Sequence, residues 1–285
     1  MHVWEAAEHV DEERAARLIR AQFAPLPERS VELVSEGWDY VVHLVDGHWA
    51  FRFPRREVVI AGTERELACL PALAEVLPVG IPAPVFVGAP GEGYPWPFYG
   101  APFLPGREAT AADGEAIARP LARALRVLHT CELDCGLPTD PMGRVDMRVR
   151  VPRTRELLRE LAVDADALLD EVETLPPARH SAVCHGDLHF RQLLVDGAAL
   201  SGIVDWIDVC RSDPAVDLSI AWSLLSADAR AEFFDEYGAI DREREVRARV
   251  VAAFLSGMLV QWARAENVPS VRDEAAAGLR RAVDG

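Results

Sequence analysis

CHGDLHFRQLLVDGAALSGIVDW (residues 184–206) is a polar loop followed by two short apolar runs, and it decides how the rest of the chain is interpreted. The runs, residues 193–195 and 201–206, flank Asp196 and Gly197. An Asp-Gly pair between apolar runs is a strong signal for a tight turn that joins two antiparallel strands. We therefore expect a β-hairpin whose two outer ends lie side by side.

Three oxygen-bearing side chains lie at the open end of this predicted hairpin. Asp187 precedes the first strand, Gln192 stands at its start, and Asp205 ends the second strand. Carboxylate and amide oxygens are ligands that suit a hard cation such as Mg²⁺, which commonly carries phosphate groups. A carboxylate next to such a metal can accept the proton of a hydroxyl group, so these residues together predict phosphoryl transfer.

The first hundred residues have the pattern of a small antiparallel sheet with helices packed on it. Asp46 and Gly47 separate two apolar runs and predict a further hairpin. Strands are predicted at residues 31–34, 40–45, 49–53, 83–88 and 96–104, and helices at residues 11–23 and 62–77. This part of the chain therefore predicts a β-rich lobe.

Helical spacing of apolar residues dominates the sequence after Pro105 and Gly106. Helices are predicted at residues 111–130, 147–173, 214–226, 228–237, 241–266 and 270–283, with only the hairpin between them. We therefore expect an α+β protein of two domains, a β-rich lobe over residues 1–103 and a helical lobe over residues 104–285. A cleft between two such lobes is a common place for a small ligand.

Composition restricts the kind of partner. The 285-residue chain has a formal net charge of −16, which disfavours nucleic acid and anionic membranes and favours a cationic small ligand. All 30 basic residues are arginines, and the lack of lysine excludes a Walker A phosphate loop and lysine Schiff-base chemistry. The polar, acidic N-terminus does not have the pattern of a signal peptide, which favours a cytoplasmic location. The oligomeric state is left open.

The hairpin stretch resembles the signature of the aminoglycoside phosphotransferase family, antibiotic kinases with a protein-kinase-like fold. The family pattern is His-Gly-Asp-x-His-x-x-Asn, then Ile/Val-Asp-Trp, then Asp-Pro-x-x-Asp. Here the three motifs occupy residues 185–192, 204–206 and 213–217. Gly37 and the Arg-Phe-Pro-Arg-Arg stretch at residues 52–56 extend the resemblance into the β-rich lobe. The resemblance implies a bilobal fold with a small antiparallel-sheet N-lobe, which binds nucleotide, and a mainly helical C-lobe with the catalytic loop.

The resemblance also assigns roles to individual residues. It implies that Asp187 is the catalytic carboxylate that orients or deprotonates the substrate hydroxyl. It implies that Asp205 and Gln192 hold Mg²⁺. Arg52 takes the place of the basic residue that holds the nucleotide phosphates, and Glu66 is expected to pair with it.

Further positions carry supporting roles in this resemblance. The turn around Gly37 is expected over the nucleotide phosphates, and the backbone near Phe103 is expected to meet the nucleotide base. His185 and Asp217 are expected to support the catalytic loop. Two residues are left as candidates for contact with the substrate, His189 and Asp208.

Two positions depart from the family pattern. Gln192 stands where the family has asparagine, and Arg52 stands where relatives often have lysine. Both replacements keep the relevant atom type, but the glutamine is one methylene longer and the guanidinium is forked. They fit drift in a chain that avoids lysine and asparagine, or a weakened kinase. Macrolide-phosphorylating relatives are similar at both places, which favours a macrolide acceptor slightly.

Several other residues have simpler structural interpretations. Trp222, Phe254 and Trp262 lie among apolar residues, which favours core packing over contact with a ligand. The acidic run at residues 164–173 has helical spacing and is typical of a solvated face. Asp213 stands where carboxylates cap the start of a helix.

Together these features predict a Mg²⁺-dependent kinase that moves the γ-phosphate of ATP or GTP to a hydroxyl of an antibiotic-like small molecule. Aminoglycosides and macrolides both carry amines, so net charge does not separate them. Two alternatives remain. One is a metabolite kinase of the same fold that acts on choline, homoserine or a sugar, and the other is an inactive nucleotide-binding pseudokinase.

Overall fold

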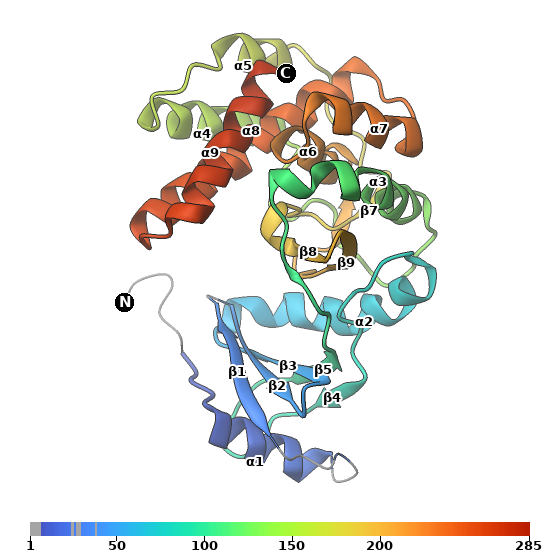
Figure 1. Ribbon diagram of the computed structural model, residues 1–285, viewed down its shortest axis with the longest axis vertical. Helices are drawn as coiled ribbons and strands as arrows, with labels where there is room; N and C mark the ends of the chain where they lie inside the picture. Colours follow the sequence, from blue (N-terminus) through green and yellow to red (C-terminus); the bar gives the residue numbers. More distant parts are fainter. Residues whose placement is uncertain (1–6, 24–25, 27–29, 38) are drawn as a thin grey trace. The chain divides into compact units, whose positions relative to one another are not determined.

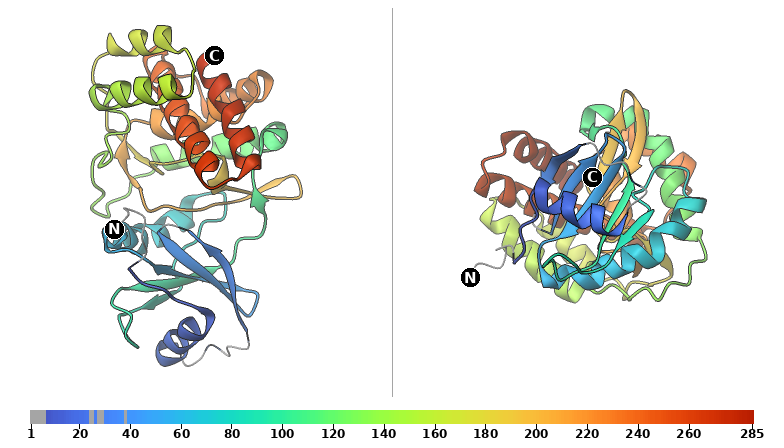
Figure 2. Two further views of the ribbon diagram at one scale, coloured as in Figure 1. Left: turned by 90° about the vertical axis from the view of Figure 1, so that its left-hand side faces the viewer. Right: turned by 90° about the horizontal axis from the view of Figure 1, so that it is seen from below.

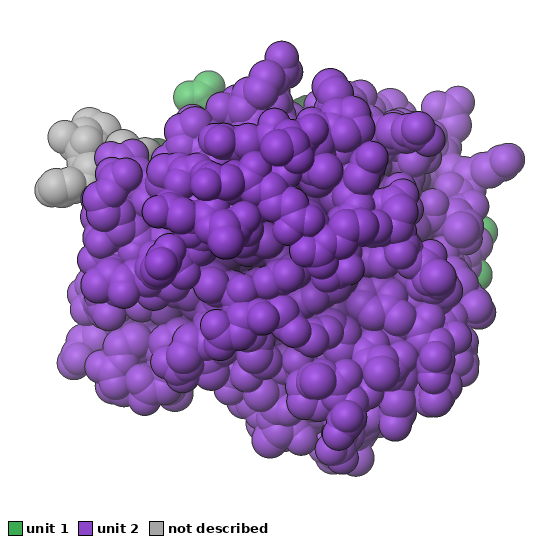
Figure 3. Space-filling view, turned by 90° about the horizontal axis from the view of Figure 1, so that it is seen from above, with its two compact units in different colours: residues 1–75, 80–104 green, residues 76–79, 105–285 purple. Residues whose placement is uncertain are grey.

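The computed structural model describes residues 7–23, 26, 30–37 and 39–285. The chain divides into two compact units, which Figure 3 colours separately. Unit 1 consists of residues 1–75 and 80–104, and unit 2 of residues 76–79 and 105–285. The short segment 76–79 therefore groups with the helical part of the chain, which the sequence pattern does not indicate.

Unit 1 contains a five-stranded antiparallel sheet in the order β1-β2-β3-β5-β4 (Figure 1). Its strands are β1 Val31–Glu36, β2 Tyr40–Val45, β3 Trp49–Pro54, β4 Phe86–Gly88 and β5 Phe98–Pro102. The central strand β3 pairs with β2 so that Arg52 lies opposite Val42, and with β5 so that Arg52 lies opposite Tyr99. This register places Arg52 in the middle of the sheet.

The two faces of this sheet differ because successive side chains of a strand point to opposite sides. Phe51 and Phe53 belong to an aromatic core with Phe98, against which helix α1 (Glu12–Gln22) packs. Gly100 is required beside this core, since a Cβ atom there would lie 2.6 Å from the Phe51 ring. Arg52 points to the other face, toward helix α2 (Ile60–Val76).

Unit 2 is mainly helical (Figure 1, Figure 2). Its helices are α3 Gly114–Thr130, α4 Met147–Glu160, α5 Asp166–Glu173, α6 Ala215–Ser223, α7 Ala227–Tyr237, α8 Arg242–Ala265 and α9 Pro269–Asp284. Its strands are β6 Arg107–Glu108, β7 Ala182–Cys184, β8 Leu193–Asp196, β9 Ala199–Ile203 and β10 Cys210–Ser212. The predicted hairpin is confirmed as β8 and β9, which pair antiparallel with Leu193 opposite Ile203. The predicted α+β class, with strands first and mostly helices afterwards, is confirmed.

The helix predicted over residues 147–173 is instead two helices, α4 and α5. The chain leaves α4 at Leu161, and Ala162 has a left-handed backbone with φ of 57°. The apolar spacing continues through this turn, so the pattern alone did not reveal it. Pro71, by contrast, lies inside α2 without ending it.

Helix α8 is the one helix among the described residues with the length and composition of a membrane span. Its apolar window is 67% buried inside the structure. Helices α6 and α9 pack against it (Figure 1). The burial identifies α8 as the central core helix of unit 2.

Candidate active site

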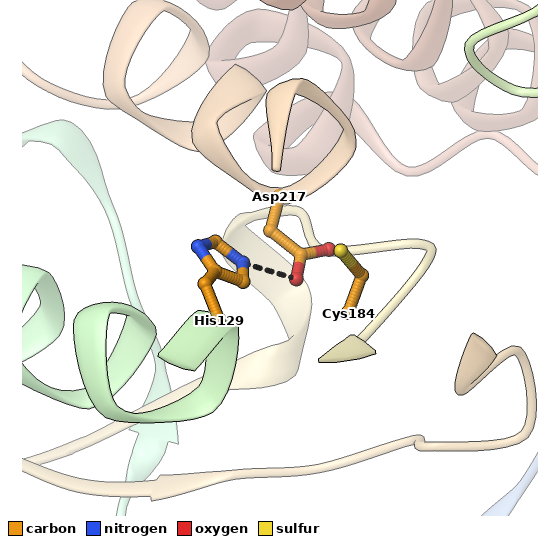
Figure 4. Close-up of side chains that lie close together, drawn as sticks. All are labelled: His129, Cys184 and Asp217. Carbon is orange, nitrogen blue, oxygen red and sulfur yellow. Dashed lines mark hydrogen bonds and ion pairs between the residues drawn. The ribbon is translucent and has the colours of Figure 1, made fainter. Parts of the chain in front are cut away.

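The loop after β7 is held in place by one carboxylate, Asp217 on helix α6. Its Oδ2 accepts the backbone N–H of His185 at 2.8 Å, and its Oδ1 accepts that of Gly186 at 2.9 Å. The Nε2 atom of His129 on α3 bonds Oδ2 at 3.0 Å (Figure 4). Burial would raise the pKa of Asp217, but its hydrogen bonds with His129 and Gly186 keep that pKa below its ordinary value.

The same loop is braced by the side chain of His185. Its Nε2 lies 3.0 Å from the carbonyl oxygen of Val204, and its ring packs on the Trp206 ring with centroids 4.7 Å apart. Gly186 has a φ of +91°, and a Cβ atom there would overlap the carbonyl oxygen of Asp208. The supporting contacts expected of His185 and Asp217 are therefore present, and they join the HGD motif to the two later motifs.

His129, Cys184 and Asp217 bring three potential metal-ligating atoms within 4.8 Å of one another (Figure 4). The hydrogen-bond network accounts for this cluster. The second ring nitrogen of His129 lies 2.8 Å from the hydroxyl of Tyr237, and both Asp217 oxygens already accept N–H groups. Burial raises the pKa of the Cys184 thiol well above its usual value, so the sulfur stays protonated.

Asp187 lies on the braced loop with an arginine bound to it. The Nη1 atom of Arg144 is 2.7 Å from its Oδ1, and the Nη2 atom of the same arginine is 2.6 Å from Oδ2 of Asp208. Burial raises the pKa of the Asp187 carboxyl to about 7, the Arg144 charge opposes this rise, and the carboxylates of Asp208 and Asp205 add to it. Two further carboxylates, from the segment between β9 and β10, therefore influence the carboxyl group of Asp187, which is typical of catalytic sites.

Asp205 follows the last residue of β9 and has a left-handed backbone with φ of 67°. Such a conformation is costly for a residue other than glycine and is found most often at functional sites. Its carboxylate acts electrostatically on Asp187, so the two acidic groups lie near each other as the hairpin predicts. An oxygen ligand of this kind fits Mg²⁺.

Gln192 fits the expected metal site less directly. It ends the short 3₁₀ turn Phe190–Gln192, and its side-chain oxygen accepts the backbone N–H of His189 at 2.8 Å. Its side chain also hydrogen-bonds Asp187. The amide would have to turn away from His189 to offer its oxygen to a cation.

His189 is a buried neutral imidazole beside these acidic groups. Burial lowers its pKa to about 3 despite the opposing charge of Asp205, and the nearby Arg191 adds to the fall. Its Nδ1 atom is buried without a hydrogen-bond partner among the described residues. A neutral ring with one open nitrogen can exchange a hydrogen bond with a bound molecule.

In unit 1 the predicted ion pair of Arg52 with Glu66 is present and buried. Arg52 Nη1 lies 3.0 Å from Glu66 Oε1 and 2.9 Å from the Tyr99 hydroxyl. The Tyr40 hydroxyl donates to the second Glu66 oxygen at 2.9 Å, and the Tyr40 ring lies 4.2 Å from the Arg52 guanidinium carbon. Two tyrosines that the sequence pattern does not single out thus fix the orientation of Arg52.

The two other unit 1 positions are at the ends of strands. Gly37 follows β1, and its N–H donates to the carbonyl of Tyr40 at 2.9 Å while its own carbonyl accepts the Arg55 guanidinium. Trp38, in the same predicted turn, lies outside the described residues. Phe103 follows β5, donates its N–H to the carbonyl of His48 at 2.8 Å and keeps an exposed ring.

Sequence reasoning missed Arg144, which lies between α3 and α4 in a segment without apolar periodicity. It also expected Trp222, Phe254 and Trp262 to be core residues, and Trp222 is indeed buried. The rings of Phe254 and Trp262 are only partly buried and carry guanidinium groups on their faces, Arg150 at 3.9 Å from the Phe254 centroid and Arg191 at 4.6 Å from that of Trp262. An arginine side chain covering an aromatic ring leaves no local sequence signal, because the partners are more than 70 residues apart.

Residues 30–252, most of the chain, match the model of the phosphotransferase enzyme family. The chain belongs to this family. Solved structures with the same fold include the GDP complex of wild-type aminoglycoside 2'-phosphotransferase-IIIa, which is 20% identical, has a TM-score of 0.74, and matches over 96% of this chain and 99% of that one. The GDP and kanamycin complex of APH(2")-IIia is 21% identical with a TM-score of 0.71, over 94% of this chain and 97% of that one.

A macrolide kinase also has this fold. Macrolide 2'-phosphotransferase MphH from Brachybacterium faecium is 20% identical with a TM-score of 0.64, over 94% of this chain and 98% of that one. The family resemblance predicted from the three motifs is therefore confirmed, and the protein is a phosphotransferase. The neighbours include both aminoglycoside and macrolide enzymes, so the fold does not by itself choose an acceptor.

Proposed function

We propose that this phosphotransferase moves the γ-phosphate of ATP or GTP to a hydroxyl of an antibiotic-like small molecule, an aminoglycoside or a macrolide. The observation that carries the proposal is the loop on which Asp187 stands near Asp205, held by Asp217, in a chain of this family. Neighbouring structures bound to GDP and to ADP support a nucleoside triphosphate as donor. Such donors and Mg²⁺ are supplied in the cytoplasm, where we expect the enzyme to act.

In this proposal Asp187 accepts a hydrogen bond from the acceptor hydroxyl and takes up its proton as the reaction proceeds. The hydroxyl oxygen forms a bond to the γ-phosphorus while the bond from that phosphorus to the β-γ bridging oxygen breaks, which releases the nucleoside diphosphate. Asp205, and Gln192 once its amide has turned, would hold Mg²⁺, whose charge would offset that of the phosphates. The braced loop keeps Asp187 aligned throughout.

The unit 1 residues would serve the donor nucleotide. Arg52 would contact the phosphates, and Glu66 with the two tyrosine hydroxyls would hold the guanidinium in one orientation. A buried, paired guanidinium is a suitable phosphate-binding group because its fork gives directed hydrogen bonds. The turn at Gly37 would cover the phosphates, and the backbone at Phe103 would meet the base.

The test is release of ADP or GDP with Mg²⁺ and a panel of acceptors: aminoglycosides, macrolides, choline, homoserine and simple sugars. We expect acceptor-dependent release with an antibiotic acceptor, and a fall of at least about a hundredfold in Asp187→Asn, since a positioned general base contributes about 10²–10⁴ in rate. Asp196→Asn is the matched control, because it makes the same change at the exposed turn of the same hairpin. Turnover of a metabolite alcohol alone would identify the metabolite-kinase alternative.

One observation favours a second candidate, a nucleotide-binding pseudokinase. The Gln192 oxygen is already engaged by the His189 N–H, which would weaken the metal site. This candidate predicts nucleotide binding without turnover of any acceptor. It also predicts that Gln192→Asn, which restores the shorter family residue, produces turnover in a chain that had none.

A further inference from the structure

A single guanidinium connects the catalytic carboxylate to a second carboxylate in unit 2. Arg144 bonds Asp187 with one terminal nitrogen at 2.7 Å and Asp208 with the other at 2.6 Å. The Arg144 side chain is only 12% exposed. A cation is therefore built into the protein at the place beside Asp187 where a positively charged group of a substrate would otherwise be attracted.

The segment that carries Arg144 is fixed by several contacts. The Asp140 carboxylate accepts the N–H of Arg144 at 2.8 Å and that of Val145 at 3.1 Å. From helix α4, Arg150 donates to the carbonyl oxygens of Arg144 and Gly143, both at 3.3 Å. These contacts fix the backbone of Arg144. The position from which its side chain extends to the two carboxylates is therefore fixed as well.

The surface next to this bridge is aromatic and basic. Phe254, Met258 and Trp262 are four residues apart on helix α8 and therefore lie on one face of it. Arg150, which donates to the Arg144 carbonyl, lies over the first ring. Arg191, on the catalytic loop and paired with Glu108 at 3.1 Å, lies over the last. Met258 between them is 45% exposed. We call this face, formed by residues 254, 258 and 262 with its two arginines, the α8 stripe.

We propose that Arg144 sets the charge of the acceptor. Because it occupies the cation position beside Asp187, and because the α8 stripe adds further guanidinium groups to apolar surface, the enzyme selects an acceptor with an apolar, weakly charged body and discriminates against polycationic amino sugars. This inference rests on the proposed kinase function and chooses the macrolide-like class within it. The net charge of −16 favours cations over the whole surface, whereas Arg144 offsets part of the charge of the two carboxylates that it bridges, so this position attracts a cation less than those carboxylates alone would.

The expected size follows from Coulomb's law. Two like unit charges about 8 Å apart, at an effective dielectric constant of about 20, repel each other strongly enough to weaken binding roughly thirtyfold. Salt screening reduces this effect at a partly exposed site to about tenfold for each ammonium group. A polycation with several such groups is therefore disfavoured strongly compared with a molecule that carries one amine.

The experiment measures binding of kanamycin and of erythromycin by calorimetry, in the presence of ADP and Mg²⁺, together with kcat/KM for each. The variants are Arg144→Gln, Arg144→Lys and, as the matched control, Arg148→Gln. Arg148 is 88% exposed on the neighbouring turn and pairs with Asp146, so its loss changes the net charge equally without touching the site. The ratio of the two acceptors within each variant cancels any general loss of activity.

We expect the parent protein to prefer erythromycin, and Arg144→Gln to shift the ratio toward kanamycin by at least about tenfold. Arg144→Lys, which keeps the charge, and Arg148→Gln should keep the parental ratio; a merely structural role would not distinguish lysine from glutamine in this way. A parent that binds kanamycin more tightly, an unchanged ratio in Arg144→Gln, or no binding of either acceptor would overturn the inference. Selective binding without phosphate transfer would instead support the inference and refute the kinase proposal.

Discussion

Replacing Asp217 with alanine is predicted to loosen the catalytic loop and destabilise unit 2. The carboxylate accepts the N–H groups of His185 and Gly186 and bonds the ring of His129, and it is fully buried. Alanine leaves the two backbone N–H groups in the interior without an acceptor. Each unsatisfied group costs about 1–3 kcal/mol, so the total loss should be about 4 kcal/mol.

Two measurements follow this loss. The midpoint of thermal unfolding should fall by about 8–16 °C, given about 2–4 °C per kcal/mol for a unit of this size. Hydrogen exchange of the segment 182–192 should rise, because the amides of His185 and Gly186 lose their acceptor. Asp217→Asn keeps one oxygen acceptor and should lose about half as much stability.

The contribution of Asp217 to stability also depends on pH in one direction. The folded-state pKa of Asp217 is lowered, so its contribution to stability is present above the ordinary carboxyl pKa and is lost as the pH falls through the folded value. Asp228→Ala is the control, since Asp228 is an exposed carboxylate in the first turn of α7 and should cost less than about 1 kcal/mol. An Asp217→Ala protein within about 1 kcal/mol of the parent, with unchanged protection of the loop amides, would refute this reasoning.

Three further predictions concern other parts of the chain. Glu66→Ala should cost about 3–5 kcal/mol in chemical unfolding because it leaves the buried guanidinium of Arg52 without its carboxylate, whereas Glu66→Gln should cost less; equal losses would contradict this. Gly186→Ala should reduce folded yield and thermal stability, because the added methyl overlaps the Asp208 carbonyl at a φ of +91°, and a fully stable variant would show that the loop tolerates it. Arg107 Nη2 lies 2.7 Å from Asp113 Oδ1, and this hydrogen bond lowers the pKa of Asp113 to about 2. The stability difference between the parent and Asp113→Asn should therefore shrink as pH falls from about 4 to 2, and a constant difference would count against the ion pair.

Much of the fold and part of the site follow from local sequence patterns. Asp-Gly pairs with flanking apolar runs predict both hairpins, and the three motifs select Asp187, Asp205 and Asp217 because their spacing reflects one loop, one strand end and one helix start. Arg144 could not be found in this way, because its role depends on turns in a segment with no periodicity. The left-handed turn at Ala162 could not be predicted either, since alanine does not indicate such a backbone conformation as glycine would.

Strands β7 and β10 are too short to be predicted from the sequence pattern. Each has three residues, too few for an alternation to be recognised, yet the two strands are antiparallel neighbours with Cys184 opposite Cys210, and β7 leads into the catalytic loop. The orientation of the Gln192 amide is similarly beyond a motif, because it depends on which neighbouring N–H takes its oxygen. Sequence therefore predicts which residues meet, and packing decides how they are oriented.

The position of Asp217 in the chain also sets an order of events during protein synthesis. The loop it holds lies 31 and 32 residues earlier in the chain, and its histidine partner lies 88 residues earlier. A ribosome making this protein therefore releases the catalytic loop before the residue that shapes it. A truncated nascent chain ending before α6 would contain Asp187 and Asp205 but no ordered loop, so translation must pass residue 217 before the chain can hold its reactive carboxylates in place.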